Sequence, residues 1–299
     1  MAITAATTLA GFSGFLTPEQ SAPIFERAAQ VSVVQQLAQQ IPLGASGQSI
    51  PIVTGKPTAG WVSEAAPKPA SQGTMSLVAM TPEKLATIIV VSAEVVRANP
   101  GNYMTLIRAQ IAEAFAIAFD AAALHGTASP FDDAIGDTTK SVEIGTAATS
   151  AGSVYADVVA GLSALVNDGK RLTGFALDNV VEPLLLGAVD TAGHPIFVDL
   201  PPSETSPTVR DGRLIGRPAR MSDGVAGGDV VAFGGDWTQA AWGAVGGISY
   251  DVSTEASVTI NSALVSLFEN NLVAVRAEAE YGFVVNDVEA FVAYENAES

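Results

Sequence analysis

The sequence contains no cysteine and only two histidines in 299 residues. Without cysteine the chain forms no disulfide, has no thiolate nucleophile and lacks the ligands of a zinc ribbon. Imidazole chemistry would depend on His125, which precedes Gly126 at the end of a helical run, or on His194, which lies in a Gly-His-Pro turn. Both positions suit structural roles at a helix end and a turn. We therefore expect neither a cofactor nor a metal ion.

Basic residues are scarce as well. Fourteen Lys and Arg stand against 31 Asp and Glu, which gives a net charge of -17. Such a surface repels phosphate backbones and anionic lipid, so nonspecific binding of nucleic acid is excluded. Residues 251–299 have one base, Arg276, and nine acids, which are Asp251, Glu255, Glu269, Glu278, Glu280, Asp287, Glu289, Glu295 and Glu298.

The chain also lacks a membrane segment. No apolar run approaches the roughly 20 residues of a spanning helix, and Met1 to Leu16 contain no Lys or Arg, unlike the start of a signal peptide. Yet charged residues make up only 15% of the chain and hydrophobic ones 48%, whereas an ordinary globular protein has about 25% charged residues. We infer that much of the outer surface is buried against partners.

Motifs that would identify an enzyme are absent. The sequence has no phosphate-binding loop, no dinucleotide fingerprint, no nucleophile elbow and no calcium-binding loop. Glu278 and Glu280 could together supply a general base, and an acidic enzyme using them is one alternative. With Arg276 beside them, we interpret these carboxylates as a solvated or salt-bridged strand face.

The first part of the chain indicates an arm followed by a hairpin. Residues 1–43 begin with small residues and become helical at 23–40. Residues 44–91 then alternate with a period of two around a tip rich in proline and glycine, which predicts a long β-hairpin. Its second run, Thr74–Ser92, would extend over about 60 Å. We expect part of this hairpin to reach onto another molecule.

Helices dominate the next segment, residues 92–152. Ser92 is a candidate N-cap of a short helix with Glu94 in its first turn, and a longer amphipathic helix is predicted over 102–126. Its apolar stripe has a spacing of four and consists of Ile107, Ile111, Phe115 and Phe119. Its polar side comprises Gln110, Glu113 and Asp120.

Helix and strand patterns alternate over residues 153–236, which predicts a compact α/β unit, and residues 237–299 return to strands. The last stretch alternates from Val273 onward. One face carries Val273, Val275, Ala277, Ala279 and Tyr281, and the other carries Arg276, Glu278 and Glu280. The fold class is therefore α+β.

The order of these segments resembles the major capsid proteins of tailed phages, a family with the Hong Kong 97 fold. The resemblance rests on Ile50-Pro51-Ile52, Trp61-Val62-Ser63-Glu64 through Lys68-Pro69, Thr81-Pro82-Glu83-Lys84-Leu85-Ala86, Ile111-Ala112-Glu113-Ala114-Phe115, Gly193-His194-Pro195-Ile196-Phe197, Leu214-Ile215-Gly216-Arg217-Pro218, Val275-Arg276-Ala277-Glu278 and Glu289-Ala290-Phe291-Val292. It implies an N-terminal arm (1–43), an extended hairpin loop (44–91), a peripheral domain with a spine helix (92–152) completed by the terminal strands (237–299), and an axial domain (153–236).

The resemblance also implies a function. Such a protein assembles with itself into hexamers and pentamers that form an icosahedral shell around double-stranded DNA, without gripping the DNA. Its location would be the virion capsid, assembled in the cytoplasm of the host bacterium without a membrane. Expected partners are a portal protein, a separate scaffolding protein and a decoration protein. A nanocompartment shell of the encapsulin type, which has the same fold, is the nearer alternative.

Some members of this family join their subunits by an isopeptide bond. By resemblance, Lys68 in the extended loop would attack the side-chain amide of Asn271, Glu278 would take the proton, and ammonia would leave. Asn271 would then have to lie in a turn or bulge before its strand begins, because an offset of seven residues places two side chains on opposite faces of a regular strand.

Overall fold

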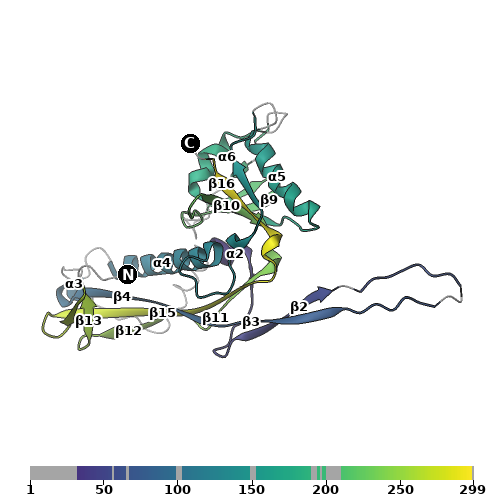
Figure 1. Cartoon of the computed structure of the whole chain (residues 1–299). Helices are drawn as coiled ribbons and strands as arrows, with labels where there is room; N and C mark the ends of the chain where they lie inside the picture. The colour runs from purple at the N-terminus through teal and green to yellow at the C-terminus, as the bar shows by residue number, and fades with distance from the viewer. Residues whose placement is uncertain are drawn as a thin grey trace.

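The computed structural model describes residues 32–55, 57–64, 67–98, 103–148, 153–189, 194–195, 197–199 and 210–297. The chain forms two sheets, one beside a long helix and the other above it, and a hairpin that projects away from both (Figure 1). This is the expected α+β class. Within the described residues, no helix combines the length and apolarity that crossing a membrane requires.

The lower sheet has five strands built around one long strand. They are β1 (Gln39–Gln40), β4 (Glu83–Ser92), β11 (Ala240–Ala244), β12 (Ser249–Ser253) and β15 (Leu272–Val285). β15 pairs with β4 along ten positions on one side and with β11 and β12 on the other. The predicted alternation is confirmed, because Ala277, Ala279 and Tyr281 are buried while Arg276 is exposed.

Helix α4 (Tyr103–His125) lies along this sheet and is the predicted long helix. Its apolar stripe is buried as expected, with Ile111, Phe115 and Phe119 each 3% exposed. The short helix α3 (Ala93–Ala98) precedes it, and Ser92 Oγ accepts a hydrogen bond from Val95 N as its N-cap.

Asp120 contradicts the predicted polar side of this helix, because it is buried. Its carboxylate accepts hydrogen bonds from Ser32 Oγ (2.5 Å), Val33 N (2.9 Å) and Val34 N (3.2 Å). It thereby satisfies the free amides at the start of α2 (Val33–Leu37). Helix α2 is shorter than the predicted helix over 23–40, of which residues 23–31 lie outside the described part, and Gln39–Gln40 form a strand instead.

The hairpin consists of β2 (Gln48–Gly55) and β3 (Thr74–Met80). The predicted single run Thr74–Ser92 is therefore wrong: it divides at Thr81-Pro82, and its second half, β4, belongs to the lower sheet. Proline interrupts the ladder because it has no N–H to donate. A smaller hairpin, β13 (Ser257–Ile260) with β14 (Ala263–Ser266), precedes β15.

The upper sheet has seven strands in the order β5-β16-β10-β6-β9-β8-β7. Their bounds are β5 (Ser141–Ile144), β6 (Gly174–Leu177), β7 (Phe197–Asp199), β8 (Arg210–Leu214), β9 (Arg217–Met221), β10 (Val230–Gly235) and β16 (Phe291–Asn296). Helices α5 (Val154–Asn167) and α6 (Glu182–Leu186) accompany them (Figure 1). Strands β5 and β16 lie outside the 153–236 predicted for this unit, because their pairing partners are distant in sequence.

Candidate assembly surfaces

The hairpin β2–β3 exposes apolar side chains over most of its length. Among the described strands, β2 and β3 pair only with each other, and Leu77 and Met75 are 72% and 66% exposed. At the tip, Trp61 is fully exposed. A two-stranded hairpin is marginal in water on its own, and open strand edges favour pairing or docking with another chain. These features make the hairpin a candidate contact surface.

The root of the hairpin is anchored on two glycines of the lower sheet. Gly243 and Gly282 are paired across β11 and β15. Met80 and Leu43, which are both buried, occupy the space above them: a Cβ atom at Gly282 would lie 2.7 Å from Met80 Cγ, and one at Gly243 would lie 2.8 Å from Leu43 Cβ. The absence of side chains at these glycines therefore lets the hairpin root approach the sheet backbone.

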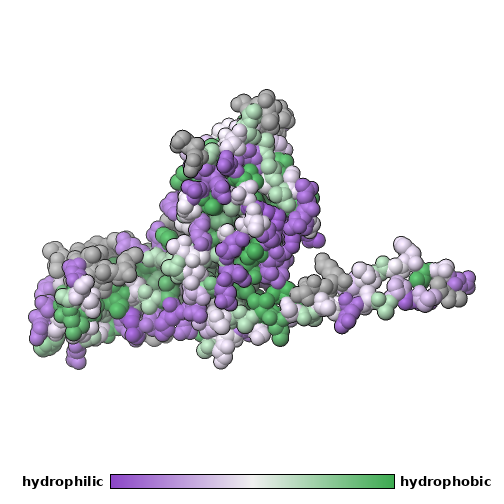
Figure 2. Space-filling model, viewed as in Figure 1, coloured by the Kyte–Doolittle hydropathy of each residue, from purple (hydrophilic) through white to green (hydrophobic). Residues whose placement is uncertain are grey.

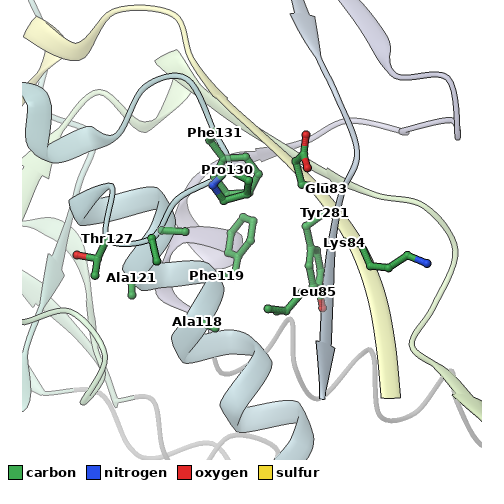
Figure 3. A pocket seen from close by; sticks show the side chains of 12 residues that line it. Glu83, Lys84, Leu85, Ala118, Phe119, Ala121, Thr127, Pro130, Phe131 and Tyr281 are labelled. Carbon is green, nitrogen blue, oxygen red and sulfur yellow. The ribbon is translucent and has the colours of Figure 1, made fainter. Parts of the chain in front are cut away.

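Next to this root lies an apolar pocket of about 390 Å³. Leu85 from β4, Phe119 from α4, Phe131 from the following loop and Tyr281 from β15 line it (Figure 3). Phe119 and Tyr281 have their ring centroids 5.3 Å apart, and burial raises the pKa of Tyr281 well above its ordinary value. Glu83, at the start of β4, also lines the pocket and supplies a carboxylate. Figure 2 shows hydrophobic surface where the hairpin leaves the body.

Glu278 and Glu280 lie on a strand surface beside basic side chains, as the sequence indicated. Lys84 Nζ is 3.5 Å from Glu278 Oε2 and 4.0 Å from Glu280 Oε1. Arg276 Nε is 3.3 Å from Glu278 Oε1, and its Nη2 is 2.5 Å from Asp251 Oδ2. These carboxylates form a salt-bridged surface.

The three residues of the predicted isopeptide bond are not brought together within one chain. Lys68 is exposed in the hairpin tip. Asn271 lies in a turn with φ of 50° directly before β15, as the offset required, and its amide donates to Glu94 Oε1. Glu278 pairs with Ala86 while Leu272 pairs with Ser92, so Asn271 and Glu278 lie about 20 Å apart along the strand at ~3.3 Å per residue.

Glutamates lie at one edge of the upper sheet, and exposed arginines lie one strand in from the other edge, whose strand β7 ends with Asp199. At the β5 edge, Glu143 and Glu295 are paired in register on neighbouring strands. Near the β7 edge, Arg213 and Arg217 of the β8–β9 hairpin are exposed. Like charges directly opposite one another destabilise a sheet unless a cation lies nearby.

The same unit exposes several large apolar side chains, namely Val180, Leu184, Leu186, Val189 and Val198.

His125 has a structural position, because its Nε2 lies 2.8 Å from Val225 O and its ring packs on Phe233. His194 is exposed. Within the described residues, no three His, Asp or Glu side chains are arranged to hold a metal ion.

Sequence reasoning missed the aromatic pocket, the paired glycines and the role of Asp120. The pocket joins residues from four separate segments, so no local pattern indicates it. An aspartate one position after Phe119 in the buried stripe was the available indication that Asp120 lies near the core.

Comparison with known proteins agrees with this architecture. The Phage capsid family matches residues 13–296. A protein of Mycobacterium phage D29 described as "Probable major capsid protein gp17" is 47% identical over 293 residues, covering 96% of this chain and 92% of that protein. Its counterpart in Mycobacterium phage L5, with the same description, is 46% identical over 297 residues, covering 96% and 91%.

A solved structure from Mycobacterium phage Cain has the same fold, with a TM-score of 0.71 at 17% identity over 96% of this chain and 100% of that chain. The named relatives are structural proteins of phage shells, which favours this class over an acidic enzyme and over a nanocompartment. Because the family model matches nearly the whole chain and two relatives are 46–47% identical to it, the chain belongs to the Phage capsid family.

Proposed function

We propose that this chain is the major capsid protein of a tailed phage, and that it assembles with itself into hexamers and pentamers of a closed icosahedral shell around double-stranded DNA. The observation that carries the proposal is the projecting hairpin β2–β3, with unpaired edges and with Leu77 and Met75 exposed. In a shell, these groups are covered by a neighbouring copy. Burial of such apolar surface is the main favourable contribution to association.

The parts of the chain have separate tasks in this proposal. Residues 44–85 lie over a neighbouring subunit, residues 1–43 form the arm, and the helix at 102–126 is the spine of a peripheral domain. The unit at 153–236, extended by β5 and β16, surrounds the centres of hexamers and pentamers, where the glutamates of the β5 edge would meet the arginines of the β8–β9 hairpin. A contact between two different patches of identical subunits generates a ring when its rotation closes.

The enclosed DNA is not gripped. The chain carries a net charge of -17, and this field repels phosphate. Purified subunits should show no salt-sensitive retention of duplex DNA. A portal protein, a separate scaffolding protein and a decoration protein complete the proposed virion, which is assembled in the cytoplasm of the host.

Light scattering and cryo-electron microscopy of the purified protein test the proposal. Closed shells with five-fold and six-fold clusters support it. A protein that stays monomeric or dimeric across salt and protein concentration, with and without a co-expressed scaffold, contradicts it.

A further inference from the structure

The tip of the hairpin carries an exposed tryptophan on one arm and an exposed lysine on the other. Gly60 and Pro69 lie together across the tip, since a Cβ atom at Gly60 would be 3.4 Å from Pro69 Cγ. Trp61 and Lys68 follow these two residues toward the turn, so they occupy matching positions on the two arms, and both side chains are exposed. Trp61 is the exposed tryptophan of three, because Trp237 and Trp242 are only 2% and 3% exposed. An indole this large is usually buried in part in a finished structure.

The pocket at the hairpin root has the complementary character. Its walls are the apolar side chains of Leu85, Phe119 and Phe131, and Glu83 adds a carboxylate (Figure 3). The volume of about 390 Å³ falls at the small end of the roughly 300–1,000 Å³ of binding pockets, which suits one aromatic side chain. Lys84 also lines the pocket, but its ammonium group points away from the rings toward Glu278 and Glu280 (Figure 3). The pocket therefore offers apolar walls to an indole and the Glu83 carboxylate to a lysine.

Within one chain the two cannot meet, because the hairpin separates them. β2 spans about 25 Å at ~3.3 Å per residue, and residues 57–61 add up to about 17 Å. Glu83 follows the root of the same hairpin, only three residues after Met80. A tip that points away from its own root can reach the root of a second copy displaced by about the length of the hairpin (Figure 1).

We propose that Trp61 of one subunit inserts into the pocket formed by Leu85, Phe119, Phe131 and Tyr281 of the next subunit, with Lys68 paired to Glu83 of that subunit. This rests on the proposed function and specifies one contact within it. The contact is head-to-tail, so it repeats from copy to copy around a ring. It also fixes Lys68 near the start of β4 of the neighbour, whereas Asn271 of that neighbour lies beyond the far end of the same β4–β15 ladder.

Acrylamide quenching of tryptophan fluorescence tests the contact directly, since Trp61 supplies the quenchable emission of the free subunit. A Trp61→Phe protein gives the baseline of the two buried tryptophans. Wild-type shells should quench no more than this baseline, while free subunits quench strongly. Wild-type shells whose Trp61 stays quenchable overturn the contact but leave the proposed shell intact; failure to assemble at all overturns both.

Two variants locate the site of burial. Ala118→Phe fills the pocket from the exposed side of α4, and Ala114→Phe makes the same change one helical turn away, outside the pocket. Shells of Ala118→Phe should leave Trp61 quenchable, and those of Ala114→Phe should protect it. Equal protection in both means that the indole is covered elsewhere, which overturns the proposal.

If Ala118→Phe folds but forms no shells, exchanging the charges of Lys68 and Glu83 tests the contact instead. Lys68→Glu and Glu83→Lys should each slow assembly, followed by light scattering, and the double variant should restore the wild-type rate. Absence of restoration in a folded double variant overturns the proposed pairing.

Discussion

Met80 lies directly on Gly282, so close that a Cβ atom at the glycine would be 2.7 Å from Met80 Cγ and 3.0 Å from Thr81 O. Met80 ends the projecting hairpin, and Gly282 lies near the C-terminal end of β15. The direction in which the hairpin leaves the body therefore depends on residue 282 of the sheet being glycine, which has no side chain.

Gly282→Val should destabilise the subunit and loosen the hairpin root. Overpacking of this kind costs about 1–3 kcal/mol, which chemical denaturation would measure, and proteases should cut the hairpin faster. Gly44→Val is the matched control, because no atom lies within 4 Å of a Cβ atom at Gly44. Equal stabilities of the two variants would show that the contact at Gly282 is not tight.

Stability should depend on pH through Asp120. Burial raises its pKa to about 7, although the hydrogen bonds from Ser32, Val33 and Val34 oppose the shift. In the unfolded chain its pKa is about 3.9. At a pH between these two values, the folded state therefore keeps a proton on Asp120 that the unfolded state has released. The stability that this proton supplies is complete below about pH 4, falls as the pH rises, and is lost above about pH 7.

Asp120→Asn removes this titration while keeping the size of the side chain. The difference in free energy of unfolding between wild type and Asp120→Asn should shift against the wild type from about pH 4 to pH 7. Denaturation curves collected across this range measure it. A difference that does not change with pH would mean that Asp120 ionises in the folded protein as it does in the unfolded chain.

Mature particles should run as a single band near 30.5 kDa after boiling in denaturing detergent. The isopeptide bond expected for some relatives needs a free Asn271 amide and a carboxylate base, but the amide donates to Glu94 and Glu278 is paired with Lys84 and Arg276. Ladders of higher mass that disappear in Lys68→Ala and Asn271→Ala would instead establish the covalent bond.

Charge reversal at the edges of the upper sheet should block ring formation. Glu143→Arg and Arg213→Glu each place like charges on the two edges proposed to meet, and the double variant restores their attraction. Native mass spectrometry measures the number of subunits in each ring. Arg171→Glu, which changes an exposed arginine outside the β8–β9 hairpin, is the control and should not be rescued by Glu143→Arg.

The elements predicted well from sequence are those whose burial follows a regular period. Helix α4 was identified by apolar residues four apart, and β15 by alternation around Arg276 and Glu278. In each case one face of the element packs against a single neighbouring layer, so the local pattern records the burial.

The elements predicted poorly depend on contacts between distant residues. The run Thr74–Ser92 has uniform strand composition, yet β3 pairs with β2 while β4 pairs with β15, which begins at Leu272. Asp120 has the residue type of a surface position, and its burial depends on hydrogen bonds from Ser32, Val33 and Val34, which are distant in sequence. The pocket at the hairpin root is assembled in the same way, from segments that the sequence holds apart.

The ladder between β4 and β15 has a consequence for how the protein is made. Ser92 pairs with Leu272, 180 positions later in the chain. At roughly 5–20 residues per second on the ribosome, β4 waits about 10–40 s for its partner. A chain released early keeps both strands of the hairpin but has no β15 to support the root. The position of the hairpin on the body therefore depends on synthesis of the chain through β15.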